Sequence, residues 1–91
     1  MKTIYKYSLE TIKNQFIDLP VDSKILCVQT QNDTPCIWAL VDDAVAALET
    51  RIIYTYGTGH DIPDADNLVY IGTYQLLIGK LIFHVFEKVI K

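Results

Sequence analysis

The sequence has 91 residues, which suits a single domain over residues 1–91 and excludes a second one. Apolar residues make up 51% of the chain, a share that excludes a disordered protein. The formal net charge of −3 argues against a basic surface that would bind duplex DNA or RNA.

The first third of the chain predicts short strands separated by turns. Polar and apolar residues alternate over residues 3–10, which predicts a half-buried strand, and residues 14–19 form a second short apolar run. Two further strand-like runs, residues 23–30 and 36–41, flank Asn32 and Asp33. Because Asn and Asp tolerate positive φ, we expect a β-hairpin here.

Residues 42–49 have the composition of a short helix. Asp42 or Asp43 can cap such a helix, and the alanines that follow favour it. We expect about two helical turns that connect two strands.

The remaining segments again indicate strands, at residues 51–56, 68–77 and 80–87, with a long irregular segment at residues 57–67. About seven short strands at intervals of roughly ten residues are typical of antiparallel all-β domains. We therefore expect a mainly β fold, a compact antiparallel β-sandwich or small barrel with one short helix.

Two of these strands, residues 36–41 and 80–87, are apolar on both faces. An antiparallel sheet in a small monomer usually leaves one face to water, and one short helix covers little of it. Association of copies would cover the second face, so we expect a homo-oligomer. A closed barrel whose loops fold back is the alternative.

The first residues alternate in polarity and lack the apolar stretch of a secretory signal. The longest uncharged stretch is too short and too polar to span a membrane. We therefore expect a cytosolic protein without a membrane partner.

Cys27 and Cys36 lie among apolar residues of expected strands. Thiols in such positions of a cytosolic protein mostly act as small buried hydrophobic groups, so we expect both to be reduced. A disulfide would require the two residues to lie opposite each other in paired strands. His60 and His84 lack the spacing of metal ligands, so we expect no metal site.

Candidate catalytic residues are few. Ser8 and Ser23 lie outside the GxSxG context of a serine nucleophile, and both cysteines lie inside strands, where thiols are usually inert. His84 is flanked by Phe83 and Val85, a setting that suits a buried, hydrogen-bonded histidine. We expect no catalytic residue, no cofactor and no enzymatic activity.

One segment has the character of a binding site. Gly57, Thr58, Gly59 and His60 follow an expected strand, and Arg51 on that strand adds positive charge. Glycines allow backbone N–H groups to turn toward an anion, and the hydroxyl and imidazole can donate further hydrogen bonds. We expect these residues to bind a small anionic ligand, with an ordinary turn as the alternative.

The sequence also resembles a family of small proteins from bacteriophages and prophages. The resemblance covers nearly the whole chain and rests mainly on residues 35–42 (PCIWALVD), 57–60 (GTGH), 70–76 (YIGTYQL) and 83–87 (FHVFE). It implies a phage accessory protein that acts in the host cytoplasm, and it transfers no catalytic residue.

Together these features lead to one functional hypothesis and two alternatives. We expect a non-enzymatic binding protein that counters a bacterial defence, either by sequestering a signalling nucleotide or by blocking a host defence protein. The alternatives are a structural or assembly component of the virion and a small phage hydrolase.

Overall fold

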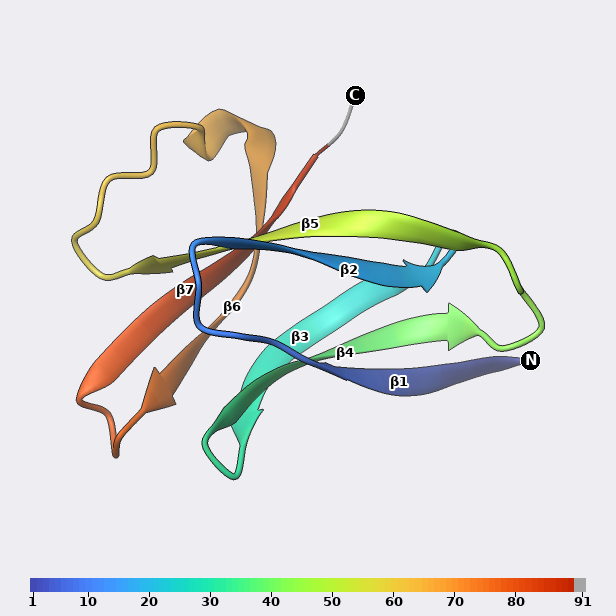
Figure 1. Cartoon of the computed structure of the whole chain (residues 1–91), viewed down its shortest axis with the longest axis horizontal. Coiled ribbons are helices and arrows are strands. Elements are labelled where there is room, and N and C mark those ends of the chain that lie inside the picture. The colour runs from blue at the N-terminus through green and yellow to red at the C-terminus, as the bar shows by residue number, and fades with distance from the viewer. Residues whose placement is uncertain (90–91) are drawn as a thin grey trace.

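The computed structural model describes residues 1–89, which form seven β-strands and one short 3₁₀ turn at Ala65–Asn67 (Figure 1). In chain order the strands are β1 (Lys2–Ser8), β2 (Asn14–Pro20), β3 (Lys24–Gln31), β4 (Thr34–Asp42), β5 (Leu48–Gly57), β6 (Leu68–Leu76) and β7 (Leu81–Lys88). Within residues 1–89, no helix has the length and apolar character needed to cross a membrane.

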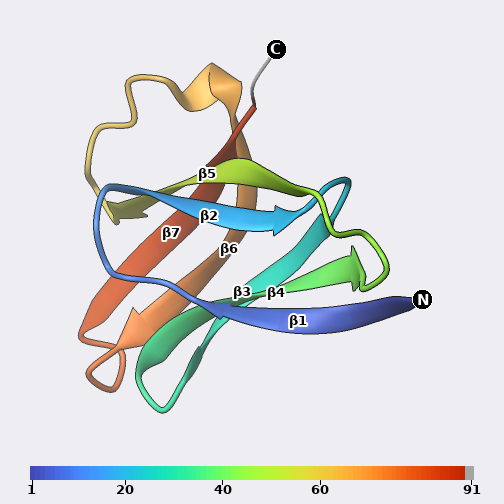
Figure 2. The same cartoon turned by 45° about the vertical axis from the view of Figure 1, so that its right-hand side comes forward.

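The strands form two antiparallel sheets that pack together as a β-sandwich (Figures 1 and 2). One sheet has the strand order β1-β4-β3 and the other β2-β5-β7-β6. The predicted mainly β, antiparallel fold is therefore confirmed. The first sheet draws its strands from the first half of the chain, whereas β2 is the edge strand of the second sheet and pairs with β5 from the second half.

The core is one layer of apolar side chains between the sheets. Ile37, Ile53 and Val85 are fully buried and come from the inner strands β4, β5 and β7, and Val28 and Leu9 pack beside them. Burial of a side chain of this size stabilises the fold by roughly 1.5–3 kcal/mol. Alternation along each strand then places the next side chain on an outer face of the sandwich.

The hairpin between β3 and β4 has the turn that the sequence predicts. Gln31 pairs with Thr34, and the two residues between them, Asn32 and Asp33, have φ angles of 53° and 60°. Two successive residues with positive φ form a turn whose twist matches that of the flanking strands. Asn and Asp adopt this conformation at low cost.

The helix expected over residues 42–49 is wrong. Asp42 still pairs with Lys2 at the end of β4, and Leu48 already pairs with Pro20 at the start of β5. Only residues 43–47 remain for the connection, and they form a turn in which the N–H of Val45 donates to the carbonyl of Asp42. The tertiary pairing on both sides therefore leaves too few residues for a stable helix.

The two thiols are free. Cys27 lies opposite Trp38 and Cys36 lies opposite Gln29 in the pairing of β3 with β4, so the cysteines are not cross-strand partners. Cys36 is buried and Cys27 is half-buried.

The sandwich is nearly closed along one side, where β6 lies against β3. A β-bulge interrupts the pairing of β6 between Tyr70 and Gly72, and Gly72 faces Val28. A Cβ atom at position 72 would lie 2.7 Å from Cγ1 of Val28. This close approach therefore depends on the missing side chain of Gly72.

We expect Gly72→Ala to destabilise the fold by about 1–3 kcal/mol, because the buried, β-branched Val28 cannot move away freely. Urea unfolding measures the change. The second substitution Val28→Ala should recover part of the loss in the Gly72→Ala background, although it destabilises the wild type by itself. Equal losses from Val28→Ala in both backgrounds would show that the two residues are not coupled.

Candidate functional site

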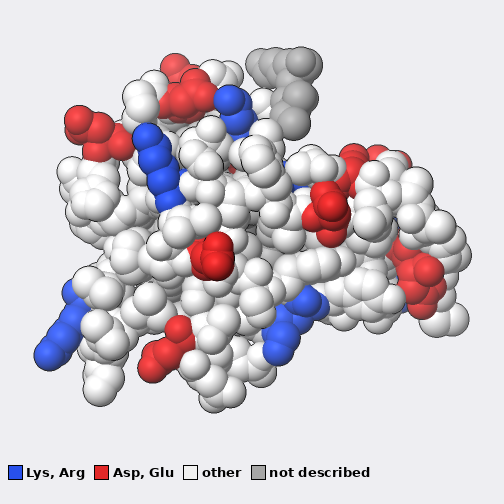
Figure 3. All heavy atoms as spheres, in the orientation of Figure 1, with Lys and Arg blue, Asp and Glu red and all other residues white. Residues whose placement is uncertain are grey.

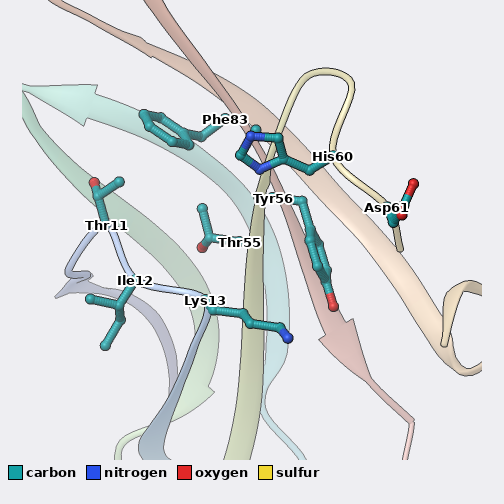
Figure 4. Close-up of a pocket in the computed structure, with 9 residues that line it drawn as sticks. Thr11, Ile12, Lys13, Thr55, Tyr56, His60, Asp61 and Phe83 are labelled. Atoms are coloured by element: carbon teal, nitrogen blue, oxygen red, sulfur yellow. The ribbon is translucent and has the colours of Figure 1, made fainter. Parts of the chain in front are cut away.

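The predicted site lies where β5 ends and the chain turns back. The N–H of His60 donates to the carbonyl of Gly57 at 3.2 Å. Gly59 has a φ of 87°, in the left-handed region that favours glycine. The turn directs the His60 side chain back toward the end of the strand that it has just left (Figure 4).

The imidazole of His60 covers the α-carbon of Gly57. A Cβ atom at position 57 would lie 3.0 Å from Cε1 and 3.2 Å from Nδ1 of the ring. Any side chain at position 57 would therefore push the ring away. The two glycines have separate roles, since Gly57 makes room for the imidazole and Gly59 supplies the backbone turn.

A hollow of about 380 Å³ opens beside this imidazole (Figure 4). Its walls come from the loop between β1 and β2, from the end of β5 with the following turn, and from β7. The lining residues are Thr11, Ile12, Lys13, Thr55, Tyr56, Gly57, His60, Asp61 and Phe83. The volume lies at the small end of the range of ligand pockets.

Thr55 lines this hollow and has a buried hydroxyl. The residue is 6% exposed, and its Oγ1 atom has no hydrogen-bond partner among residues 1–89. Burial of an unpaired hydroxyl costs about 1–3 kcal/mol, so such groups are rare in folded proteins. Figure 4 shows Thr55 in the middle of the ring of lining side chains.

The loop between β1 and β2 places a cation and a second hydroxyl at the same hollow. The N–H of Thr55 donates to the carbonyl of Lys13 at 2.9 Å, which fixes Lys13 beside the strand. Thr11 shares a hydrogen bond of 2.8 Å with the hydroxyl of Tyr74. Burial raises the pKa of Tyr74, and the bond with Thr11 partly opposes the rise. The Tyr74 phenol is therefore neutral at physiological pH.

A second hollow of about 420 Å³ shares part of its lining with the first. Gly57, His60 and Phe83 line both hollows, and Lys80 supplies the cation of the second one. His60 therefore lines both recesses, each of which has its own lysine.

Thr58 lines only the second hollow and is held on the outer face of the four-stranded sheet. Its hydroxyl lies 2.7 Å from Nε2 of His84, whose Nδ1 lies 2.9 Å from the hydroxyl of Thr73. Thr73 in turn is 2.6 Å from the hydroxyl of Tyr70. Both ring nitrogens of His84 therefore have hydroxyl partners. An imidazole that donates from one nitrogen and accepts at the other can make both hydrogen bonds.

The structure does not bring Arg51 to this site. Arg51 precedes Gly57 by six residues, which is about 20 Å along a strand. Its guanidinium donates from Nε and Nη2 to the carboxylate of Glu87, and from Nη1 to the carbonyl of Ser23 at 2.7 Å. The hydrogen bonds to Glu87 raise the pKa of Arg51, although burial opposes the rise. Arg51 is thus engaged in joining β5 to β7 and to the start of β3.

Of the four predicted loop residues, Gly57 and His60 line the first hollow, Thr58 lines only the second, and Gly59 lines neither but supplies the turn. The structure also adds residues that sequence reasoning missed. The additional polar groups are Thr55 and Lys13. The strand pattern could have indicated Thr55, because a polar residue two positions after Ile53 falls on the core face of β5. No pattern in the sequence indicates Lys13, because its position depends on how the loop between β1 and β2 folds.

The whole chain, residues 1–91, matches the model of a family described as a domain of unknown function (DUF7352), and the chain belongs to this family. Neither the curated proteins nor the solved structures contain a significant match to the chain. The function must therefore be inferred from the residues of the chain itself.

We expect Gly57→Ala to displace the imidazole of His60, because the new methyl group would lie 3.0 Å from the ring. The protein has two histidines, so ring signals in ¹H–¹³C NMR spectra report on each separately. The His60 signals should shift, whereas those of His84 should stay in place.

Gly59→Ala is the matched control. It should cost about 1 kcal/mol through its positive φ, and no atom outside the adjoining residues Thr58 and His60 lies within 4 Å of the added Cβ. The His60 signals should therefore shift less than they do in Gly57→Ala. Unchanged His60 signals in Gly57→Ala would contradict the close approach of the ring.

Proposed function

We propose that this member of the DUF7352 family is a non-enzymatic binding protein that takes a small anionic ligand, such as a signalling nucleotide, into the hollow beside His60. The observation that carries the proposal is that Thr55, which lines this hollow, has a buried hydroxyl without a hydrogen-bond partner among residues 1–89. A ligand that hydrogen-bonds to Thr55 would remove the cost of burying this group.

The charges and the aromatic rings around the hollow suit an anion with a flat apolar part. Lys13 supplies a positive charge, and His60 offers ring nitrogens for hydrogen bonds. Asp61 also lines the hollow, but its carboxylate points away from Thr55 in Figure 4. Tyr56 and Phe83 provide aromatic surface, on which a base stacks with about 1–3 kcal/mol.

The hydrogen bonding of the hydroxyls supports binding rather than catalysis. The hydroxyl of Thr11 is bonded to Tyr74, and within residues 1–89 neither Thr11 nor Thr55 hydrogen-bonds to His60. A nucleophilic hydroxyl requires a base within hydrogen-bonding distance. Thr58 does hydrogen-bond to a histidine, His84. The other ring nitrogen of His84 bonds to the hydroxyl of Thr73, however, and not to a carboxylate that would orient the ring for catalysis.

The proposed biological role is counter-defence in the cytoplasm of an infected bacterium, which the resemblance to small phage proteins suggests. Sequestration of a nucleotide signal requires only tight binding, and a hollow without a paired nucleophile and base suffices for it. Direct blocking of a host defence protein is the second candidate, favoured by the exposed apolar side chains on both sheets. A virion component and a small hydrolase remain the alternatives.

We expect Thr55→Val to have opposite effects on stability and on binding. The free variant should unfold at higher urea concentration, because an unpaired buried hydroxyl is replaced by a methyl group of similar size. Its affinity for the nucleotide should fall about tenfold, the equivalent of one hydrogen bond. Calorimetric titration with cyclic dinucleotides and with ADP-ribose measures the affinity, with inorganic phosphate as the reference anion.

Lys13→Gln should weaken the same binding and make it less sensitive to salt, because one ion pair is lost. Lys24→Gln, which removes an exposed lysine at the start of β3, is the matched control and should leave the affinity unchanged. Thr11→Val should destabilise the protein, because its hydroxyl is already bonded to Tyr74.

The outcomes separate the candidate functions. Absence of binding to every nucleotide tested would exclude nucleotide sequestration and leave the blocking of a host protein. Conversion of a bound nucleotide, detected by chromatography after incubation, would show an enzyme. Co-purification with virus particles would indicate a virion component.

A further inference from the structure

The hairpin between β6 and β7 carries apolar residues in an unfavourable backbone conformation. Leu77 and Ile78 have φ angles of 52° and 55°, and Gly79 follows at 81°. Positive φ is rare for residues other than glycine, Asn and Asp, and it is a clear outlier for a β-branched side chain such as that of Ile78. Each such residue costs on the order of 1–3 kcal/mol.

This strained turn presents its side chains to solvent. Ile78 is fully exposed and is not stabilised by packing in its own chain, and Leu77 is 57% exposed and packs only in part. The equivalent turn between β3 and β4 has Asn32 and Asp33 at positive φ, where they are well tolerated. Apolar residues that are both strained and exposed stabilise a fold only when something outside the chain covers them.

An apolar hollow of about 320 Å³ lies on the outer face of the other sheet. Ile4 from β1, Leu26 and Cys27 from β3 and Trp38 from β4 line it, together with Gln29. Ile4 and Leu26 are large apolar residues that are exposed here. Leu26 sits at the bulge of β3, so its side chain is not needed for the pairing with β4.

We propose that a second copy of this chain fills the hollow, with Ile78 of one copy inserted against Trp38 of the next. The turn at residues 77–79, called the tip here, belongs to the four-stranded sheet, whereas the apolar hollow beside Trp38 belongs to the three-stranded sheet. Each copy therefore has one tip and one apolar hollow. Such a head-to-tail contact joins copies into a ring or an open chain. It also covers apolar surface that a single copy leaves in water.

The chemistry of the two surfaces favours a second copy over a lipid bilayer. The tip offers two apolar side chains, which is little for anchoring in a membrane, and the hollow is apolar and of a size to receive them. On the face drawn in Figure 3 the Lys and Arg side chains lie apart from one another, so this face has no basic patch that would attract anionic lipid.

The contact should be weak and strengthened by salt. It covers a small area, so we expect a dissociation constant on the order of 10–100 μM. Lys80 follows the tip, Lys6 pairs with Trp38 beside the hollow, and each copy has a net charge of −3. The lysines on the two surfaces repel each other, and so do the net negative charges of two copies. Salt screens both repulsions, whereas it does not weaken an apolar contact.

Light scattering and the fluorescence of Trp38, the one tryptophan of the chain, test the contact directly. The mass and a blue shift of the emission should rise together as the concentration increases from about 1 μM to 1 mM, since insertion of Ile78 removes water from Trp38. A protein that stays monomeric over this range would overturn the proposal.

Ile78→Asn should abolish both changes and raise the Tm by about 4–8 °C, because Asn accepts the positive φ. Leu48→Gln removes another exposed leucine and should change neither the mass nor the emission. Equal self-association of Ile78→Asn and the wild type would contradict the proposal.

A mixing experiment distinguishes a head-to-tail contact from a symmetric one. Leu26→Glu should block the hollow and leave the tip intact, so neither it nor Ile78→Asn should associate alone. Their equimolar mixture should form a dimer and nothing larger, because one variant contributes the hollow and the other the tip. A mixture that stays monomeric would overturn the proposal, as would flotation of the wild type, but not of Ile78→Asn, with phosphatidylcholine vesicles.

Discussion

The thinness of the sandwich is the constraint on which the rest of the structure depends. The shortest extent of the backbone is 15 Å, which leaves room for one layer of side chains between the sheets. Ile37, Ile53 and Val85 occupy the middle of that layer and are fully buried. Because half of the residues are apolar, one layer cannot hold them all, and the outer faces take the remainder. The exposed apolar residues are thus a direct result of the small size of the domain.

The same thinness explains why the hollow beside His60 forms at a rim of the sandwich and not between the sheets. At the rim the core layer ends, so a loop can stand over a strand end without displacing core side chains. Gly57 allows the imidazole to approach the strand, and the backbone bond between Thr55 and Lys13 brings the neighbouring loop to the same place. The hollow is therefore built on two strand ends, which fix the positions of its polar groups more firmly than a free loop would.

The sequence predicts those parts of the structure that depend on interactions between residues close together in the chain. Asn32 and Asp33 predict their turn because the conformation is a property of those residues, and the strand alternation reports burial directly. The expected helix fails because pairing at Asp42 and Leu48 overrides the helix propensity of the alanines between them. The prediction that Arg51 belongs to the site fails because a strand pattern does not indicate which partner a charged side chain contacts. Glu87, which binds it, lies far away in sequence and comes close only when β5 pairs with β7.

The position of β7 within its sheet has a consequence for how the chain folds during synthesis. β7 lies between β5 and β6 and is hydrogen-bonded to both, yet it follows them in the chain. Until β7 leaves the ribosome, β6 has no partner strand and β5 has only β2. Val85, which is fully buried, is missing from the core for the same time. The early part of the chain therefore exposes apolar strand edges throughout its synthesis, and the sandwich closes in a late step that involves contacts distant in sequence.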